Sequence, residues 1–150
     1  MARSSRTADS FTALALVLFL FPPYALAAGK PVIKADCQIS EHPCTKTTDG
    51  LTATLEITPR PVRDMRELVF TVFLSQGSKA VTDAKVAVDL TMPDMIMGQN
   101  LVRMAHKMQG IYAGKGVIVR CPSGKKLWRA EVRAHRGKKT IVVPFLFEVR

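Results

Sequence analysis

The stretch that decides the fold is residues 51–58, which reads LTATLEIT. Apolar residues alternate with threonine and glutamate, so an extended backbone would point the two sets of side chains to opposite faces. Threonine is β-branched and favours strands. Pro59 and Pro61 end the pattern, because proline has no N–H to donate to a strand ladder. The stretch therefore predicts a β-strand with one buried face.

Comparable patterns follow along the chain. A more continuous apolar run over 68–74 predicts a strand covered on both faces or nearly so, and alternation predicts half-buried strands over 84–90, 101–108, 117–121, 127–134 and 141–149. We expect a loop over 92–100 and a short connection punctuated by Gly110, Gly114 and Gly116. Pro144 places the last strand on an edge or gives it a bulge. These roughly seven strands predict an all-β fold, an antiparallel immunoglobulin-like β-sandwich.

The first 28 residues have the features of a signal peptide. Arg3 and Arg6 precede an apolar run over 11–21, and small residues over 25–27 offer a cleavage site. The run is short for a membrane-spanning helix, which needs about 20 apolar residues. We therefore expect a periplasmic or secreted protein that contacts the membrane only if this segment is retained. Residues 29–50 are expected to be an irregular arm, and 51–150 the single sandwich domain.

The chain is strongly basic, with 22 Lys and Arg against 12 Asp and Glu and a formal net charge of +10. An exported basic protein can meet anionic lipid, cell-wall polymer or an acidic partner protein. The charge can also serve solubility alone. Export makes nucleic acid a poor candidate for the partner.

Three cysteines occur, Cys37, Cys44 and Cys121. Export permits disulfides, and Cys37 and Cys44 are the natural pair by proximity. Cys121 is then a buried free thiol, although pairing with one of the other two stays open. A metal site formed by both early cysteines and His42 is conceivable, but the spacing matches no standard zinc pattern. The chain carries none of the common catalytic motifs, so we expect no enzymatic activity.

Methionine is concentrated in one segment. Five of the seven methionines fall within residues 92–108, and a histidine lies between the last two. Thioether sulfur and imidazole nitrogen suit monovalent copper. In an extended strand, Met104, His106 and Met108 would project to one face. The alternative is core packing, for which methionine is well suited. The candidate Cu(I) ligands are Met95, Met97, Met104, His106 and Met108.

The same segment carries a family resemblance. The run Met92-Pro-Asp-Met-Ile-Met-Gly98, then Gly110-Ile-Tyr-Ala-Gly114 and a tryptophan strand over 128–132, resembles the YtkA-like and FixH-like domains across roughly residues 51 to 149. The methionine-rich composition is also similar to the Cu(I) site of CopC-type periplasmic carriers. The early cysteines and Cys121 lie outside the YtkA-like pattern.

The resemblance implies an exported, non-enzymatic β-sandwich, with some relatives linked to copper delivery or to the assembly of copper-containing oxidases. We therefore expect a binding module that handles Cu(I) through the methionine and histidine cluster. The alternative is a metal-free protein-interaction module that assists assembly of an envelope or oxidase complex. The expected partner in either case is an envelope protein or a copper-enzyme assembly partner.

Overall fold

The computed structural model describes residues 32–150. The predicted signal segment, residues 1–28, lies outside this range and stays a prediction. Nowhere in 32–150 is there a helix that could cross a membrane.

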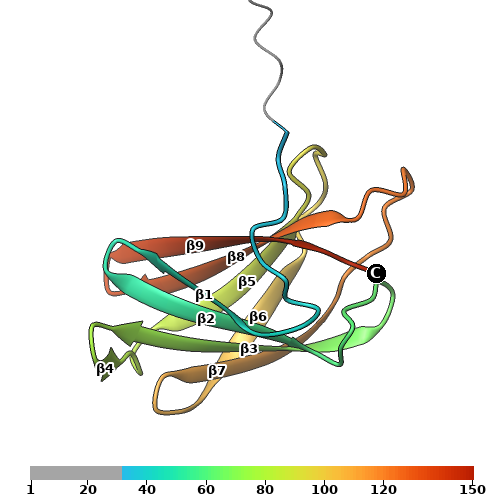
Figure 1. Ribbon diagram of the computed structural model, residues 1–150. Helices are drawn as coiled ribbons and strands as arrows, with labels where there is room; N and C mark the ends of the chain where they lie inside the picture. The colour runs from blue at the N-terminus through green and yellow to red at the C-terminus, as the bar shows by residue number, and fades with distance from the viewer. Residues whose placement is uncertain (1–31) are drawn as a thin grey trace, which may run out of the picture. The chain divides into compact units, whose positions relative to one another are not determined.

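The described part of the chain is built from strands (Figure 1). In chain order they are β1 (Cys44–Thr48), β2 (Leu51–Thr58), β3 (Glu67–Gln76), β4 (Lys79–Ala80), β5 (Lys85–Thr91), β6 (Leu101–Met108), β7 (Ile111–Val117), β8 (Leu127–Arg136) and β9 (Lys139–Glu148).

All the strand pairs are antiparallel, and they follow the order β1-β2-β3-β7-β6-β5-β8-β9, with β4 beside the end of β3. Strand β6 joins the two layers, because its first half pairs with β5 and its second half pairs with β7. The predicted all-β antiparallel fold is confirmed. Its two layers form one nearly closed sheet with β1 and β9 at the free edges.

The alternation of apolar and polar residues along the strands explains which side chains form the core. In β2 every second residue is buried, as the threonine pattern predicts. The buried face continues through large side chains from both layers, among them Phe70 of β3, Tyr112 of β7, Trp128 of β8 and Phe145 of β9. Trp128 is 2% exposed, so this large side chain is an anchor of the core.

Three expectations about individual strands were wrong. Strand β3 is buried on one face only, since Phe73 is 39% exposed. The glycine-rich segment over 111–117 is strand β7 rather than a connection, and residues 118–121 are not a strand. The arm over 29–50 contains β1, whose polar sequence CTKTT gave no alternation to read.

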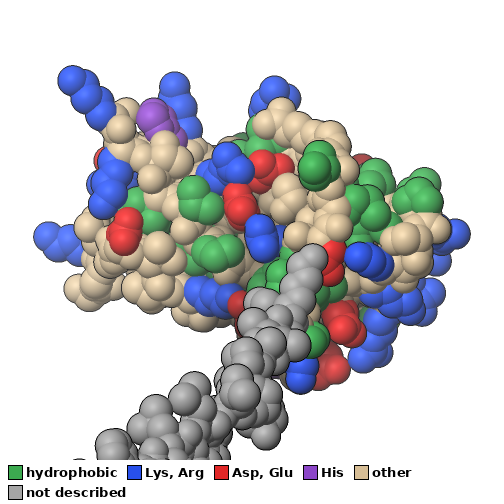
Figure 2. All heavy atoms as spheres, turned by 90° about the horizontal axis from the view of Figure 1, so that it is seen from above, with side chains coloured by type: hydrophobic (Ala, Val, Ile, Leu, Met, Phe, Trp, Pro, Cys, Tyr) green, Lys and Arg blue, Asp and Glu red, His purple; other side chains and the backbone are tan. Residues whose placement is uncertain are grey.

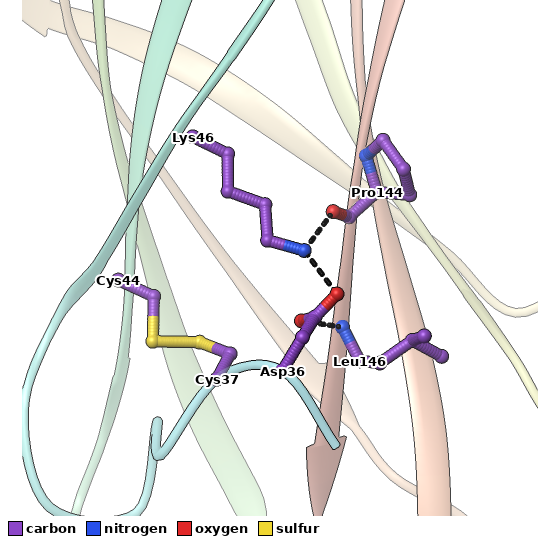
Figure 3. A network of polar contacts seen from close by, with 6 residues as sticks. All are labelled: Asp36, Cys37, Cys44, Lys46, Pro144 and Leu146. Carbon is purple, nitrogen blue, oxygen red and sulfur yellow. Dashed lines mark hydrogen bonds and ion pairs between the residues drawn. A yellow bond between two sulfur atoms is a disulfide. The ribbon is translucent and has the colours of Figure 1, made fainter. Parts of the chain in front are cut away.

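The seam between β1 and β9 is closed by contacts of Asp36 and Lys46 with β9 instead of a strand ladder (Figure 3). The Asp36 N–H donates to the Leu146 carbonyl at 2.9 Å, and Asp36 Oδ1 accepts the Leu146 N–H at 2.9 Å. Lys46 Nζ donates to Asp36 Oδ2 and to the Pro144 carbonyl. Strand β9 pairs only with β8 among the described strands, so the predicted edge position of Pro144 is confirmed.

Candidate functional site

Strand β6 crosses closely over β7 because β7 has glycine at the crossing. A Cβ atom built on Gly114 would lie 2.4 Å from the Arg103 carbonyl oxygen and 3.0 Å from Met104 Sδ. A Cβ on Gly116 would lie 2.4 Å from a Val102 methyl carbon. Those distances leave no room for a side chain, so the glycines allow the two strands to approach. Gly114 and Gly116 therefore mark close packing of two strands, and not the loop that the sequence predicted.

Met104 and His106 are brought together on the inner face of β6. Met104 lies opposite Val86 of β5 and packs against the core while remaining partly exposed. His106 lies opposite Tyr112 of β7, with ring centroids 5.1 Å apart, and its side chain is exposed. Residues two apart on a strand share a face at a spacing of about 7 Å. A partly buried methionine and an exposed histidine therefore lie two residues apart on one face of β6.

Met108 does not join that face. The pairing of β6 with β7 shifts between His106 and Met108, which is a β-bulge, and Met108 then lies opposite Ile111. Because Tyr112 points into the core, its neighbour Ile111 points outward, and directly opposed residues share a face. The bulge therefore turns Met108 to the outside, where it is 63% exposed. The prediction of one common face was wrong for Met108 because of this bulge, which no sequence signal marks.

Met95 and Met97 lie in the loop between β5 and β6, as predicted. Met95 N–H donates to the Met92 carbonyl at 3.3 Å, and both loop methionines pack partly buried against the core. The loop stands at the opposite end of β6 from the β6–β7 turn (Figure 1). His106 is five residues beyond the start of β6, or about 16 Å along the strand. Met95 and Met97 therefore lie near the start of β6, whereas His106 lies near its other end.

Tyr112 of β7 is hydrogen-bonded to the connection between β4 and β5. Its side chain is 1% exposed. The hydroxyl donates to the Val81 carbonyl at 3.0 Å and accepts the Ala84 N–H at 3.3 Å. Tyr112 is therefore a packing element of the core, and it also fixes the surface against which the His106 ring rests.

The cysteines are used as the sequence predicted. Cys37 and Cys44 form a disulfide and are both buried, which excludes them as ligands of a site with His42. Cys121 is a free, buried thiol. Its Sγ lies 3.0 Å from Ser123 Oγ, and this hydrogen bond lowers the pKa of the thiol below its ordinary value of 9.0.

Residues 32–150 contain no cluster of three or more His, Cys, Asp or Glu side chains arranged to hold a metal ion. A site in this range would need thioether donors. Sequence reasoning missed Asp36 and Lys46, because their pairing with β9 joins residues about a hundred positions apart and leaves no local signal.

Comparison with known families gives one match, to the model described as YtkA-like, over residues 45–119. No curated protein and no solved structure matched the chain. The match covers all of β2 to β7 and includes the methionine segment. It begins after Cys44 and ends before Cys121, as expected, but it also ends before the tryptophan strand that we had included in the resemblance. Because the match spans half of the sequence, the chain belongs to the YtkA-like family.

Proposed function

We propose that this protein is an exported, non-enzymatic binding module that carries Cu(I), with Met104 and His106 as its principal ligands. The supporting observation is their placement side by side on the inner face of β6, where the sulfur is half-buried and the imidazole is exposed. Export is compatible with the Cys37–Cys44 disulfide, since such bonds persist in oxidising compartments.

The chemistry of this pair suits a carrier. Thioether sulfur and imidazole nitrogen are soft to borderline donors that favour Cu(I) over harder cations. Thioether sulfur carries no proton to lose, so its contribution to binding does not depend on pH. An exposed imidazole lets a second protein approach the ion, whereas the core packing of Met104 keeps the sulfur in place.

The other three predicted ligands have lesser roles in this proposal. Met108 faces outward beyond the bulge, so it would reach the ion only if the end of β6 rearranged. Met95 and Met97 would contribute only if the β5–β6 loop closed over β6. We therefore expect their replacement to weaken Cu(I) binding less than replacement of Met104 and His106 together.

A competition titration of Cu(I) against a chromogenic chelator under reducing conditions tests the proposal. The wild-type protein should withdraw one equivalent of Cu(I). The variant Met104→Leu/His106→Gln should lose at least about tenfold in affinity, because two donors disappear. Met95→Leu/Met97→Leu is the matched control, and leucine conserves volume well enough to keep the fold. Equal affinity of the wild type and Met104→Leu/His106→Gln would refute the assignment.

The second candidate is a metal-free interaction module that assists assembly of an envelope or oxidase complex. Full exposure of Ile96 at the tip of the β5–β6 loop favours it, because an exposed large aliphatic side chain can mark a contact surface. Absence of Cu(I) binding by the wild-type protein in the same titration would leave this candidate as the better one.

A further inference from the structure

Exposed lysines are concentrated at one end of the nearly closed sheet. The β1–β2, β3–β4, β6–β7 and β8–β9 turns lie there, as the pairings of Leu51 with Gln76 and of Lys85 with His135 require. A hydrogen bond of 3.0 Å from Arg136 to Gln76 links the ends of β8 and β3. We call this region the lysine end, and its members are Lys79, Lys85, Lys107, Lys138 and Lys139.

These lysines take no part in the ion pairs of the described residues. Within residues 32–150, none of the five has a carboxylate within 4 Å, and all are exposed. At the other end, some basic side chains are paired, as in Arg60 with Glu56 and Arg120 with Asp64, whereas Arg63, Arg66 and Lys126 have no carboxylate partner among the described residues. Figure 2 shows several Lys and Arg side chains projecting around a histidine on the left of the molecule. Unpaired like charges repel, so their concentration favours an external acidic partner.

An apolar row adjoins the lysine end. Phe73 of β3, Ile111 of β7 and Met108 of β6 lie opposite one another in register on the outer face of the sheet. Phe73 is 39% exposed and Met108 is 63% exposed. The bulge that turns Met108 outward completes this row. Apolar residues flanked by charged ones are the usual composition of a protein-binding surface.

We propose that the lysine end and the apolar row form a docking surface for an acidic protein whose contact region has an apolar centre. The turn residues Asp49-Gly50, Gly77-Ser78 and Gln109-Gly110 carry no large apolar side chain, and the exposed apolar row lies on the outer face of the sheet behind them, so this surface fits a protein better than a bilayer. A second copy of the chain would place lysine against lysine. His106 lies beside Lys107, so the partner would dock next to the proposed copper ligands. To that extent the inference rests on the copper proposal, but docking itself needs no metal.

Binding of a fluorescent synthetic peptide, with three leucines flanked by glutamates, tests the surface without copper. Lys79→Glu/Lys107→Glu/Lys138→Glu should lower affinity by about tenfold at low salt. Its matched control at the other end, Arg63→Glu/Arg66→Glu/Lys126→Glu, changes the net charge equally and should lower affinity by less than about threefold. Phe73→Ser should weaken binding of this peptide but leave binding of an all-glutamate peptide unchanged.

Equal losses in the two triple variants would overturn the proposal, because they would show a general effect of net charge. Tighter binding to phosphatidylglycerol vesicles than to the peptide, or lysine-dependent dimerisation, would also overturn it in favour of a lipid or a second copy. Circular dichroism confirms that each variant is folded. Met104→Leu/His106→Gln should bind the peptide like the wild type, so failure of the docking surface and failure of the copper site are separate results.

Discussion

Gly114 and Gly116 show how single residues set the approach of two strands. The hypothetical Cβ of Gly116 meets the Val102 side chain, whereas that of Gly114 meets a backbone oxygen that cannot move aside without shifting β6. The position of Met104 relative to His106 depends on this contact. Sequence alone does not separate a glycine needed for close packing from one needed for a turn, which explains why β7 was missed.

Gly116→Ala should destabilise the protein by about 1–3 kcal/mol, because the added methyl group overpacks the contact with Val102. Urea unfolding measures the change. Combining it with Val102→Ala should cost less than the two single changes together, since the smaller side chain makes room. Gly98→Ala is the control, with nothing within 4 Å of the added carbon. Additive effects of Gly116→Ala and Val102→Ala would contradict the proposed clash.

The ion pair between Asp83 and Arg136 should make a small, pH-dependent contribution to stability. Arg136 Nη2 donates to Asp83 Oδ2 at 3.0 Å, and this hydrogen bond lowers the pKa of Asp83 below 3.8. A lowered folded-state pKa gives stability that is present above pH 3.8 and is lost as the pH falls through the folded value.

Asp83→Asn should therefore be slightly less stable than the wild type at pH 7, and the difference should shrink as the pH falls below 3.8 through the lowered pKa of Asp83. Denaturant unfolding of both proteins across this range measures the difference. Arg136→Gln should give the same pH profile, because it removes the same pair. A difference in stability that is constant with pH would show that the carboxylate charge is not involved.

Among the secondary-structure elements, the contacts between the N-terminal arm and β9 could not be predicted from sequence patterns. Alternation predicted β2, β8 and β9 well, because each buries one face against the core. It also predicted β6, although only Val102 of that strand is fully buried. The seam depends instead on polar contacts between Asp36, Lys46 and β9, which are distant in the chain. The bulge in β6 was equally hidden, and it removed Met108 from the predicted site while Met104 and His106 stayed together.

Loss of the Cys37–Cys44 disulfide should cost about 2–3 kcal/mol, on the chain-entropy model for a short loop. The variant Cys37→Ser/Cys44→Ser, compared with the wild type in urea, measures this cost. A Cys121→Ser background prevents disulfide exchange in both proteins. With Cys121 also replaced, the double variant has no cysteine, so reductant should destabilise only the protein that keeps Cys37 and Cys44. Equal stability of that protein with and without reductant would contradict the observed disulfide.

Asp36→Ala should open the seam locally. The Leu146 N–H loses its acceptor, so its hydrogen exchange should accelerate by about tenfold or more, since one hydrogen bond contributes roughly 1 kcal/mol or more when a charged group accepts it. The Phe145 amide is the internal control, because Phe145 lies opposite Ala130 of β8 within the ladder. Equal acceleration at both amides would indicate global destabilisation rather than release of the edge.

At the level of the complete domain, the nearly closed sheet explains why the proposed copper ligands and part of the proposed docking surface share strand β6. Strand β6 belongs to both layers, so its inner face passes from the core at Val102 to solvent at His106. Sequence patterns predicted the fold class, which follows from local alternation, and they supplied the candidate donors, whose role stays a prediction. They did not predict which donors share a face, because that depends on a bulge and on which strands become neighbours.

The most direct test of Cu(I) binding by Met104 and His106 is NMR of the protein labelled at methionine methyl groups and histidine rings, titrated with Cu(I) under reducing conditions. We expect the Met104 methyl and His106 ring signals to shift until one equivalent is added. The Met92 methyl, whose residue is 5% exposed, should stay in place. Methyl and ring signals that do not respond, or shifts confined to Met95 and Met97, would contradict the proposed site.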